Sequence, residues 1–267
     1  MNIGNRVSVN IENQVASVQL NRPEKHNALD LEMFQAIAKM QSKLAGESRL
    51  RAVVLSGSGV DFCTGLDIKS LMKDRSGMRK LLWKWLPWRP NLAQQVAVGW
   101  RTLPVPVISA IQGRCWGGGM QIALGTDFRV AEPGASISIM VGKWGLIPDM
   151  GGTLALRELT TRDQAMWLAM TAVEFSADQA LEQGLLTAVS ENPALEALEM
   201  AKQFSERSPD AVAAVKRLYR KSWSGGTGLA LARETAYQLR ILTGGNQKIA
   251  VRRQLGETRD YRRAGKW

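Results

Sequence analysis

The sequence lacks long hydrophobic runs, and none approaches the roughly 18 apolar residues that a transmembrane helix requires. Residues 1–8 contain no apolar stretch of the kind that a secretion signal carries. We therefore expect a cytoplasmic chain without a membrane span. The 267 residues are 45% hydrophobic and 22% charged, which excludes wholesale disorder and collagen-like structure. This length predicts one or two domains with a substantial core.

Cysteine and histidine are also scarce. The two cysteines, Cys63 and Cys115, fit neither a disulfide framework nor the spacing of a zinc site. We expect a reducing compartment, no metal, and two cysteines that pack as small hydrophobic residues. The single histidine, His26, falls in an early loop, and no Ser-His-Asp or Cys-His arrangement is apparent. We expect His26 to face solvent.

Negative charge is in short supply relative to positive charge. The chain has 35 Lys and Arg against 24 Asp and Glu, a net charge of +11 with histidine neutral. Such an excess indicates an anionic partner, which could be a nucleic acid, a membrane surface or a polyanionic small molecule. No recognised RNA-binding motif is present, which argues against nucleic acid without excluding it.

The first half of the chain mixes strands and helices. Residues 15–20 alternate between apolar and polar side chains, as in a half-buried strand. Residues 51–56 and 105–111 contain short apolar runs that suit buried strands. Between the first two strands, apolar residues recur at helical spacing from 33 to 44, and Asp30 can cap that helix.

The second half is mostly helical. Ser176 begins a capping-box pattern, and Asn192 and Ser208 each precede a proline that suits the first helical position. A last helical stretch runs from about Thr227 and is broken near Gly244. The order of elements predicts an α/β core followed by a helical C-terminal extension.

Two glycine-bearing loops, residues 61–68 and 113–121, follow expected strands. The second contains three successive glycines before an apolar run, which leaves bare backbone N–H groups at a helix start. Such groups favour an anion or a developing oxyanion. The alternative is a tight turn that needs positive φ and close packing. Neither a Gly-x-Gly-x-x-Gly nor a Walker pattern occurs.

Several segments, in order and spacing, resemble the crotonase superfamily, which is the enoyl-CoA hydratase/isomerase family. They are Asn21–Leu29, Phe62–Ile68, Pro106–Gly113, Gly117–Gly119 and Gly145–Thr153. The resemblance runs from about residue 5 to 260. It implies a spiral of ββα units in residues 1–195 and a helical C-terminal trimerisation region in residues 196–267, in trimers or dimers of trimers. It also implies an acyl-CoA substrate, with coenzyme A as part of that substrate and no separate cofactor.

The resemblance assigns an oxyanion hole to the backbone N–H groups of Leu66 and Gly118. An enolate formed from a thioester places negative charge on the thioester oxygen. Fixed N–H donors in a dry site stabilise such charge by about 3 kcal/mol. Because only the backbone is required, the apolar side chain of Leu66 is compatible with this role.

The sequence departs from the family at two positions. Hydratases of the family hold and activate water with two glutamates, and Gln121 and Val141 occupy those places here. General acid–base catalysis is typically worth about 10²- to 10⁴-fold, so ordinary hydration is doubtful. Double-bond isomerisation needs only one shuttling base. The alternatives are an acyl-CoA-binding protein with impaired catalysis, or a family member that binds RNA.

Asp149 is the best remaining candidate for a base or nucleophile, because family members that act on dienoyl-CoA or aryl-CoA use an aspartate at this position. The alternative is that Asp149 caps a helix that begins near Met150. A base at neutral pH would need a pKa raised by burial. Lys143 is a weaker candidate.

The resemblance also implies positions that contact the substrate. They are Lys25, Ala28, Cys63, Gly65, Asp67, Ile68, Lys69, Gly117, Gln121, Val141 and Trp144. Residues 248–267 carry seven basic and two acidic residues. In the family, C-terminal basic residues, sometimes from a neighbouring subunit, approach the CoA phosphates. A solvated tail is the alternative.

The segment from Met78 to Trp100 is unusually rich in tryptophan and basic residues. In the family this segment shapes the acyl end of the pocket, and large apolar walls would suit a long or bulky acyl group. An amphipathic surface segment for a membrane or a partner protein is a second interpretation. Core packing is a third.

Overall fold

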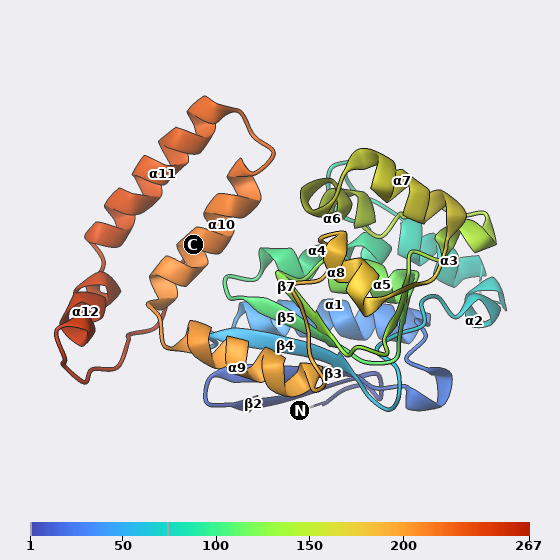
Figure 1. The fold of residues 1–267 in the computed structure, drawn as a ribbon, viewed down its shortest axis with the longest axis horizontal. Helices are drawn as coiled ribbons and strands as arrows, with labels where there is room; N and C mark the ends of the chain where they lie inside the picture. The colour runs from blue at the N-terminus through green and yellow to red at the C-terminus, as the bar shows by residue number, and fades with distance from the viewer. Residues whose placement is uncertain (1, 74) are drawn as a thin grey trace.

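The computed structural model describes residues 2–73 and 75–267. Figure 1 shows a sheet flanked by helices and a separate helical arm at the C-terminus. The strands of a seven-stranded sheet follow the order β1-β2-β3-β4-β5-β7-β10. They are β1 (Asn2–Ile3), β2 (Val7–Glu12), β3 (Val15–Leu20), β4 (Ala52–Gly57), β5 (Val107–Ile111), β7 (Phe128–Ala131) and β10 (Ala188–Val189). From β3 to β10 every pairing is parallel, whereas β1, β2 and β3 pair antiparallel.

A smaller sheet of three strands lies beside the first. It consists of β6 (Arg114–Trp116), β8 (Ser136–Ser138) and β9 (Phe175–Ser176). The short helices of the body are η1 (Pro23–Lys25), α2 (Ile68–Lys73), α3 (Arg75–Leu82), α5 (Gly118–Leu124), η2 (Val141–Trp144), α6 (Gly152–Leu159), α7 (Arg162–Thr171) and α8 (Ala177–Glu182). Among the described residues, no helix combines the length and the apolar character needed to cross a membrane.

The burial of each strand follows its position in the sheet. In β3, Ala16, Val18 and Leu20 are fully buried while the residues between them are exposed. All five residues of β5 are buried, as expected for a parallel strand with helices on both faces. The predicted strands therefore form, and they occupy adjacent places in one sheet.

Helices α1 (Leu31–Ala45) and α4 (Leu92–Thr102) pack against each other beside the sheet. The Asp30 carboxylate accepts from Met33 N at 2.8 Å, which is the predicted cap of α1. The capping box at Ser176 also forms, as do the caps at Asn192 and Ser208. Local capping signals thus locate several helix starts correctly.

Helix α9 (Pro193–Ser205) lies on the opposite face of the sheet and belongs to the core. Its Ala197 and Ala201 are fully buried in a cluster with side chains of β4, β5 and β7. The boundary expected at residue 195 therefore falls inside a helix that packs on the sheet.

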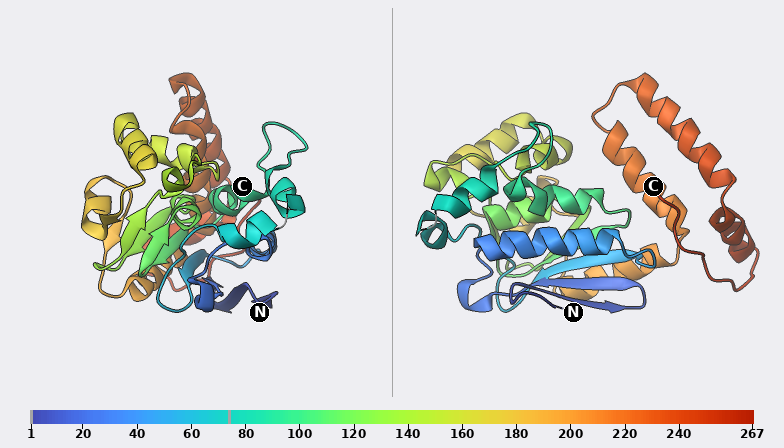
Figure 2. Two further views of the ribbon diagram at one scale, coloured as in Figure 1. Left: turned by 90° about the vertical axis from the view of Figure 1, so that its right-hand side faces the viewer. Right: turned by 180° about the vertical axis from the view of Figure 1, so that it is seen from behind.

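The C-terminal arm consists of α10 (Pro209–Ser222), α11 (Thr227–Leu242) and α12 (Gly245–Gln254). Figures 1 and 2 show it standing away from the body, with α11 farther from the sheet than α10. The buried ammonium of Lys216 holds α10 to the core by donating to Trp100 O at 3.0 Å and Val105 O at 2.8 Å. Asp127 completes this anchor at 2.6 Å.

Candidate active site

The loops that follow β3, β4 and β5 meet at the carboxyl ends of these parallel strands. Leu29 N donates to Gly65 O at 2.8 Å, and Leu29 forms a parallel bridge with Leu66. Cys63 forms a second parallel bridge, with Cys115. Residues far apart in the sequence thus become neighbours where open α/β sheets commonly bind ligands.

The close approach of these loops depends on glycine. Gly65 has φ of +92°, and a Cβ there would lie 3.2 Å from Gly118 N. A Cβ on Gly119 would lie only 2.3 Å from Cys63 O, closer than real side chains come. Gly117 has φ of +53°. Close packing and positive φ therefore account for glycine in the segment Gly117–Gly119, as the turn interpretation predicts. The oxyanion interpretation remains open.

Unpaired backbone N–H groups occur where these loops meet, and those of Leu66 and Gly118 are the pair that the resemblance assigns to the oxyanion hole. Gly117 N donates to Ser138 O at 2.9 Å. In contrast, Leu66 N and Gly118 N donate to no acceptor within residues 2–73 and 75–267. Gly118 is the first residue of α5, where N–H groups have no intrahelical acceptor, and together with Leu66 N on the adjoining loop its N–H is a candidate ligand donor. They suit an oxygen that carries developing negative charge.

Gln121 lies on α5 and is only 1% exposed. Its Oε1 accepts from Met150 N at 2.9 Å and from Gly152 N at 3.3 Å. Its Nε2 is buried and has no partner among the described residues. Gln121 therefore holds the loop that carries Asp149, and its amide has no useful proton affinity with which to act as a base.

Val141, the residue expected at the place of the second glutamate, is equally unsuited to proton transfer. Val141 is buried, with 6% of its surface exposed, at the start of η2. Trp144, at the end of η2, is 61% exposed. Lys143 pairs with Glu174 at 3.1 Å, so its ammonium already has a counter-ion.

Asp149 does not cap a helix, so the structural alternative for this residue is wrong. Helix α6 begins two residues later than expected, at Gly152, and its N-cap is Gly151 with φ of +84°. The side chain of Asp149 is exposed, but the surrounding protein partly desolvates its carboxyl group and raises its pKa. A raised pKa is the property that a carboxylate base needs near neutral pH.

Met150, the residue after Asp149, lies against the glycine loop. A Cβ on Gly118 would lie 3.1 Å from Met150 Sδ. The residue that follows Asp149 thus packs directly against one of the two unpaired N–H donors. Asp149 and Gly118 are therefore brought to the same part of the molecule.

Several expected substrate contacts lie together beside Leu66. Lys25 O accepts from Ala28 N at 2.9 Å in the turn after η1. Ala28 and Ile68 are half-buried, and Lys25 and Lys69 are exposed. Both ammonium groups are therefore accessible to an anion.

Asp67 has a different environment from the one expected for a substrate contact. Its carboxylate pairs with Arg22 at 2.9 Å and accepts from Ser70 N at 3.0 Å. Burial raises the pKa of Asp67, but the Ser70 N–H and the charge of Arg22 outweigh it and hold the pKa below its usual range. Asp67 therefore fastens the loop.

The basic C-terminal residues lie at the far end of the molecule. In Figure 1, α12 and the chain end are on the side opposite to α2. Part of this stretch folds back, since Arg262 N donates to Asn246 Oδ1 at 2.8 Å and the Arg240 guanidinium lies over the Trp267 ring. Within one chain it does not approach Lys25 or Lys69.

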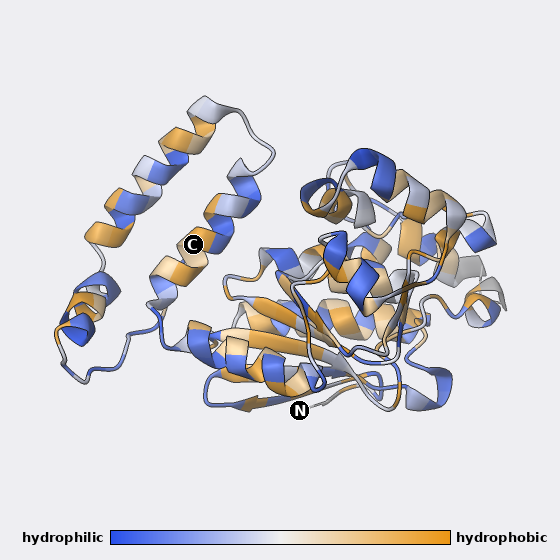
Figure 3. Ribbon diagram, viewed as in Figure 1, coloured by the Kyte–Doolittle hydropathy of each residue, from blue (hydrophilic) through white to orange (hydrophobic). Residues whose placement is uncertain are grey.

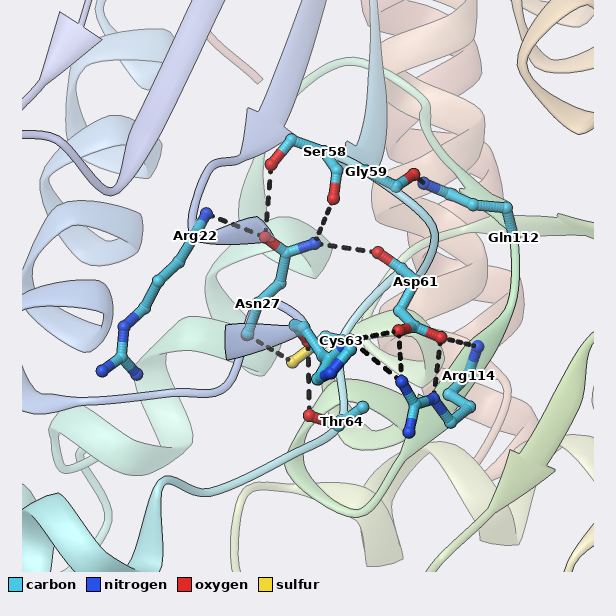
Figure 4. A network of polar contacts seen from close by, with 10 residues as sticks. Arg22, Asn27, Ser58, Gly59, Asp61, Cys63, Thr64, Gln112 and Arg114 are labelled. Carbon is cyan, nitrogen blue, oxygen red and sulfur yellow. Dashed lines mark hydrogen bonds and ion pairs between the residues drawn. The ribbon is translucent and has the colours of Figure 1, made fainter. Parts of the chain in front are cut away.

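A buried carboxylate links the three loops, which the sequence did not reveal (Figure 4). Asp61 Oδ2 lies 2.8 Å from His26 Nδ1 and accepts from Arg114 Nη2 at 2.7 Å. Asp61 Oδ1 accepts from Arg114 N and Nε. Burial raises the pKa of Asp61, but Arg114 and His26 outweigh it and hold the pKa low. The His26 ring is half exposed, as expected, yet it is held by Asp61.

Asn27 strengthens the same junction. Its Nδ2 donates to Ser58 O at 2.9 Å and to Asp61 O at 2.8 Å. Its backbone carbonyl accepts from Cys63 Sγ at 3.1 Å (Figure 4). Both cysteines are buried and free, as expected, and burial raises the pKa of Cys63 to about 12. Cys63 is therefore a packing residue.

The tryptophans of the segment from Met78 to Trp100 differ in their exposure to solvent. Trp100 is fully buried in the core. In contrast, Trp83, Trp85 and Trp88 are 64%, 79% and 77% exposed. Core packing is therefore wrong for these three.

The sequence profile of the family described as enoyl-CoA hydratase/isomerase matches residues 10–249. The chain belongs to the enoyl-CoA hydratase/isomerase family. It is 32% identical over 247 residues to YngF of Bacillus subtilis (strain 168), a protein named for the same family, covering 90% of this chain and 92% of that one. It is 29% identical over 237 residues to 1,2-epoxyphenylacetyl-CoA isomerase of Escherichia coli (strain K12), covering 85% and 87%.

Solved structures of this family share the fold. An enoyl-CoA hydratase from Bacillus anthracis superposes with a TM-score of 0.86 at 25% identity, covering 96% of this chain and 98% of that one. An enoyl-CoA hydratase from Polaromonas sp. JS666 gives a TM-score of 0.83 at 29% identity, covering 96% and 100%. The predicted crotonase fold, in the α/β class, is confirmed.

Proposed function

We propose that this enoyl-CoA hydratase/isomerase family member moves a double bond within an acyl-CoA thioester. The N–H groups of Leu66 and Gly118 bind the thioester oxygen, and Asp149 carries the proton. The observation that supports this most is the pair of unpaired N–H groups beside the loop that bears Asp149. The named activity of the E. coli relative, an isomerase acting on an acyl-CoA, agrees with it.

The proposed reaction needs one base. The Asp149 carboxylate removes a proton from carbon 2 of a 3-enoyl thioester, and negative charge spreads to the thioester oxygen. The two N–H groups stabilise that charge. Asp149 then returns the proton to carbon 4. The double bond, which lay between carbons 3 and 4, now lies between carbons 2 and 3. Because no water is added, neither of the absent glutamates is needed.

The test is turnover of 3-enoyl-CoA and 2-enoyl-CoA, followed by chromatography of the products. We expect isomerisation and little hydration. Asp149→Asn should lower kcat by about 10²- to 10⁴-fold with little change in KM. Asp178→Asn, which removes an exposed carboxylate on α8, is the matched control and should keep full activity.

The pH profile gives a second readout. Since partial desolvation raises the pKa of Asp149, and the base is active when deprotonated, kcat/KM should fall as the pH drops through that raised pKa. The acid limb should therefore lie above the usual range of an aspartate and vanish in Asp149→Asn. Full activity of Asp149→Asn, or hydration as the main reaction, would contradict the proposal.

A second candidate function is acyl-CoA binding without chemistry. Gln121 and Val141 favour it, because neither side chain can transfer a proton and both are buried. Calorimetry with a stable acyl-CoA distinguishes the two functions. Tight binding with no product from any enoyl-CoA would support a binding protein, and turnover would exclude it.

A further inference from the structure

A surface feature on the connection between α3 and α4 has no part in the proposed chemistry. We call residues 83–90 the tryptophan loop. It contains Trp83, Trp85 and Trp88, all at least 64% exposed. In the left view of Figure 2 this connection is the teal loop that projects away from the body. Three large aromatic side chains therefore face solvent on one short protrusion.

The loop makes little use of these side chains within the protein. The rings of Trp83 and Trp85 contact each other, with centroids 6.3 Å apart. Across the described ranges, none of the three indole N–H groups donates a hydrogen bond to a protein oxygen. Clustered exposed aromatics mark interaction surfaces, because hydrating them is unfavourable. Indoles are enriched where an apolar phase meets water, since the ring is apolar and the N–H is polar.

The charge around the loop has a single sign. Arg79 and Lys80 lie in the last turn of α3, and Lys84 and Arg89 lie in the loop. The sequence from 75 to 126 contains no Asp or Glu. Among the described residues, these four cations form no salt bridge, although Lys84 Nζ donates to Pro87 O at 3.4 Å. The tryptophans are therefore surrounded by uncompensated positive charge.

We propose that the tryptophan loop docks this protein on an anionic lipid surface. The indoles enter the interface between headgroups and acyl chains, while the four cations contact lipid phosphates. The charge pattern favours lipid over an apolar protein groove, because lipid phosphates offer many negative groups without a fixed arrangement. This docking is peripheral and reversible, and it does not depend on the proposed catalysis.

The first test measures binding to vesicles. The full chain is sedimented with vesicles of phosphatidylcholine alone or of phosphatidylcholine with phosphatidylglycerol, at low and physiological salt. We expect binding to the anionic vesicles that weakens with salt. Brominated lipid should quench tryptophan fluorescence, since the indoles enter the interface.

The second test uses variants. The double variant Trp85→Ser with Trp88→Ser should bind at least about tenfold more weakly. Lys84→Gln and Arg89→Gln should each weaken binding about fivefold. The matched control is Trp223→Ser, directly after α10, which removes a tryptophan that is 63% exposed elsewhere and stacks on Tyr219. It should bind as the parent does. Thermal melting checks that each variant folds.

Three results would overturn the proposal. One is no vesicle binding, or equal binding with and without phosphatidylglycerol. Another is equal loss of binding in Trp223→Ser and in the loop variant. The third is that, without vesicles, the loop tryptophans become protected from a soluble quencher. Protection on adding acyl-CoA would assign the loop to the substrate pocket, and protection on self-association would assign it to a contact between copies.

Discussion

At the scale of single residues, Asp61 connects the parts of the site. Its carboxylate, 4% exposed, contacts His26 on the loop after β3 and Arg114 at the start of β6. It thereby holds the segment that leads to Leu66 and the segment that leads to Gly118. Both N–H donors depend on this junction, although Asp61 itself is a positioning residue.

Asp61→Asn should destabilise the protein in a pH-dependent way. The folded protein holds the pKa of Asp61 below its unfolded value, so the stabilisation is fully present above that unfolded value, near 3.8. We expect a loss of about 1–3 kcal/mol in the free energy of unfolding at pH 7. The difference from the parent should shrink as the pH falls below about 4.

Urea denaturation at several pH values measures this difference. Glu191→Gln, which removes an exposed carboxylate on the loop before α9, is the control and should behave as the parent at every pH. A loss in Asp61→Asn that is equal at pH 3 and pH 7 would contradict the role assigned to the charge.

Gln121 gives a second residue-scale prediction. Gln121→Ala removes the acceptor for Met150 N and Gly152 N and leaves a cavity. We expect a loss of about 2–5 kcal/mol in unfolding free energy and a lower kcat, since the Asp149 loop is no longer held. Gln121→Glu keeps an acceptor for both N–H groups, so denaturation should show a smaller loss. Equal losses in the two variants would contradict this account.

At the scale of elements, two loops form the site because a helix start lies against a strand end. Gly119, near the start of α5, lies against the carbonyl of Cys63. Alanine normally favours a helix over glycine by about 1 kcal/mol, but here its Cβ has no room. Packing between elements therefore overrides helix propensity at this position.

Gly119→Ala should separate the two loops. We expect a loss of about 1–3 kcal/mol in stability and a large fall in kcat, because the N–H groups of Leu66 and Gly118 move apart. Gly228→Ala is the matched control, since nothing lies within 4 Å of a Cβ there in α11. It should be neutral or slightly stabilising. Full activity in Gly119→Ala would refute this arrangement.

At the scale of the whole molecule, the arm exposes apolar surface. Helix α11 has no buried residue, and Leu231 and Leu239 are 57% and 60% exposed. Figure 3 shows hydrophobic, orange stretches along this helix. A groove of 810 Å³ also lies between α10 and the core, lined by Asp127, Lys216 and Tyr219 among others. Such surfaces mark interaction sites in soluble proteins.

We therefore expect self-association through the arm, in agreement with the trimer that the family resemblance predicts. Sedimentation velocity should detect an oligomer for the parent chain. The double variant Leu231→Glu with Leu239→Glu should shift it toward the monomer, because charge replaces apolar contacts. Leu195→Glu on α9, 52% exposed, is the control outside the arm and should leave the mass unchanged. A monomeric parent would contradict this prediction.

Much of the architecture was predictable from local patterns. The alternation in β3 and the caps of α1 and α8 depend on residues within one or two turns of each other, so spacing reveals them. The glycine loops are also visible in the sequence, as are the uncharged side chains of Gln121 and Val141. The boundary predicted at residue 195 falls within α9, and no local signal in the sequence says that this helix packs on the sheet.

The sequence by itself determined the strands, the helix starts, the glycine loops and the absence of a carboxylate at positions 121 and 141. The tertiary structure decided the rest. His26 joins Asp61 and Arg114 across 35 and 88 residues, and no spacing rule covers such distances. The raised pKa of Asp149 and the exposure of three tryptophans likewise depend on which distant segments exclude water from each side chain. Hydrogen-bond periodicity acts locally along the chain, whereas desolvation is a property of the assembled molecule.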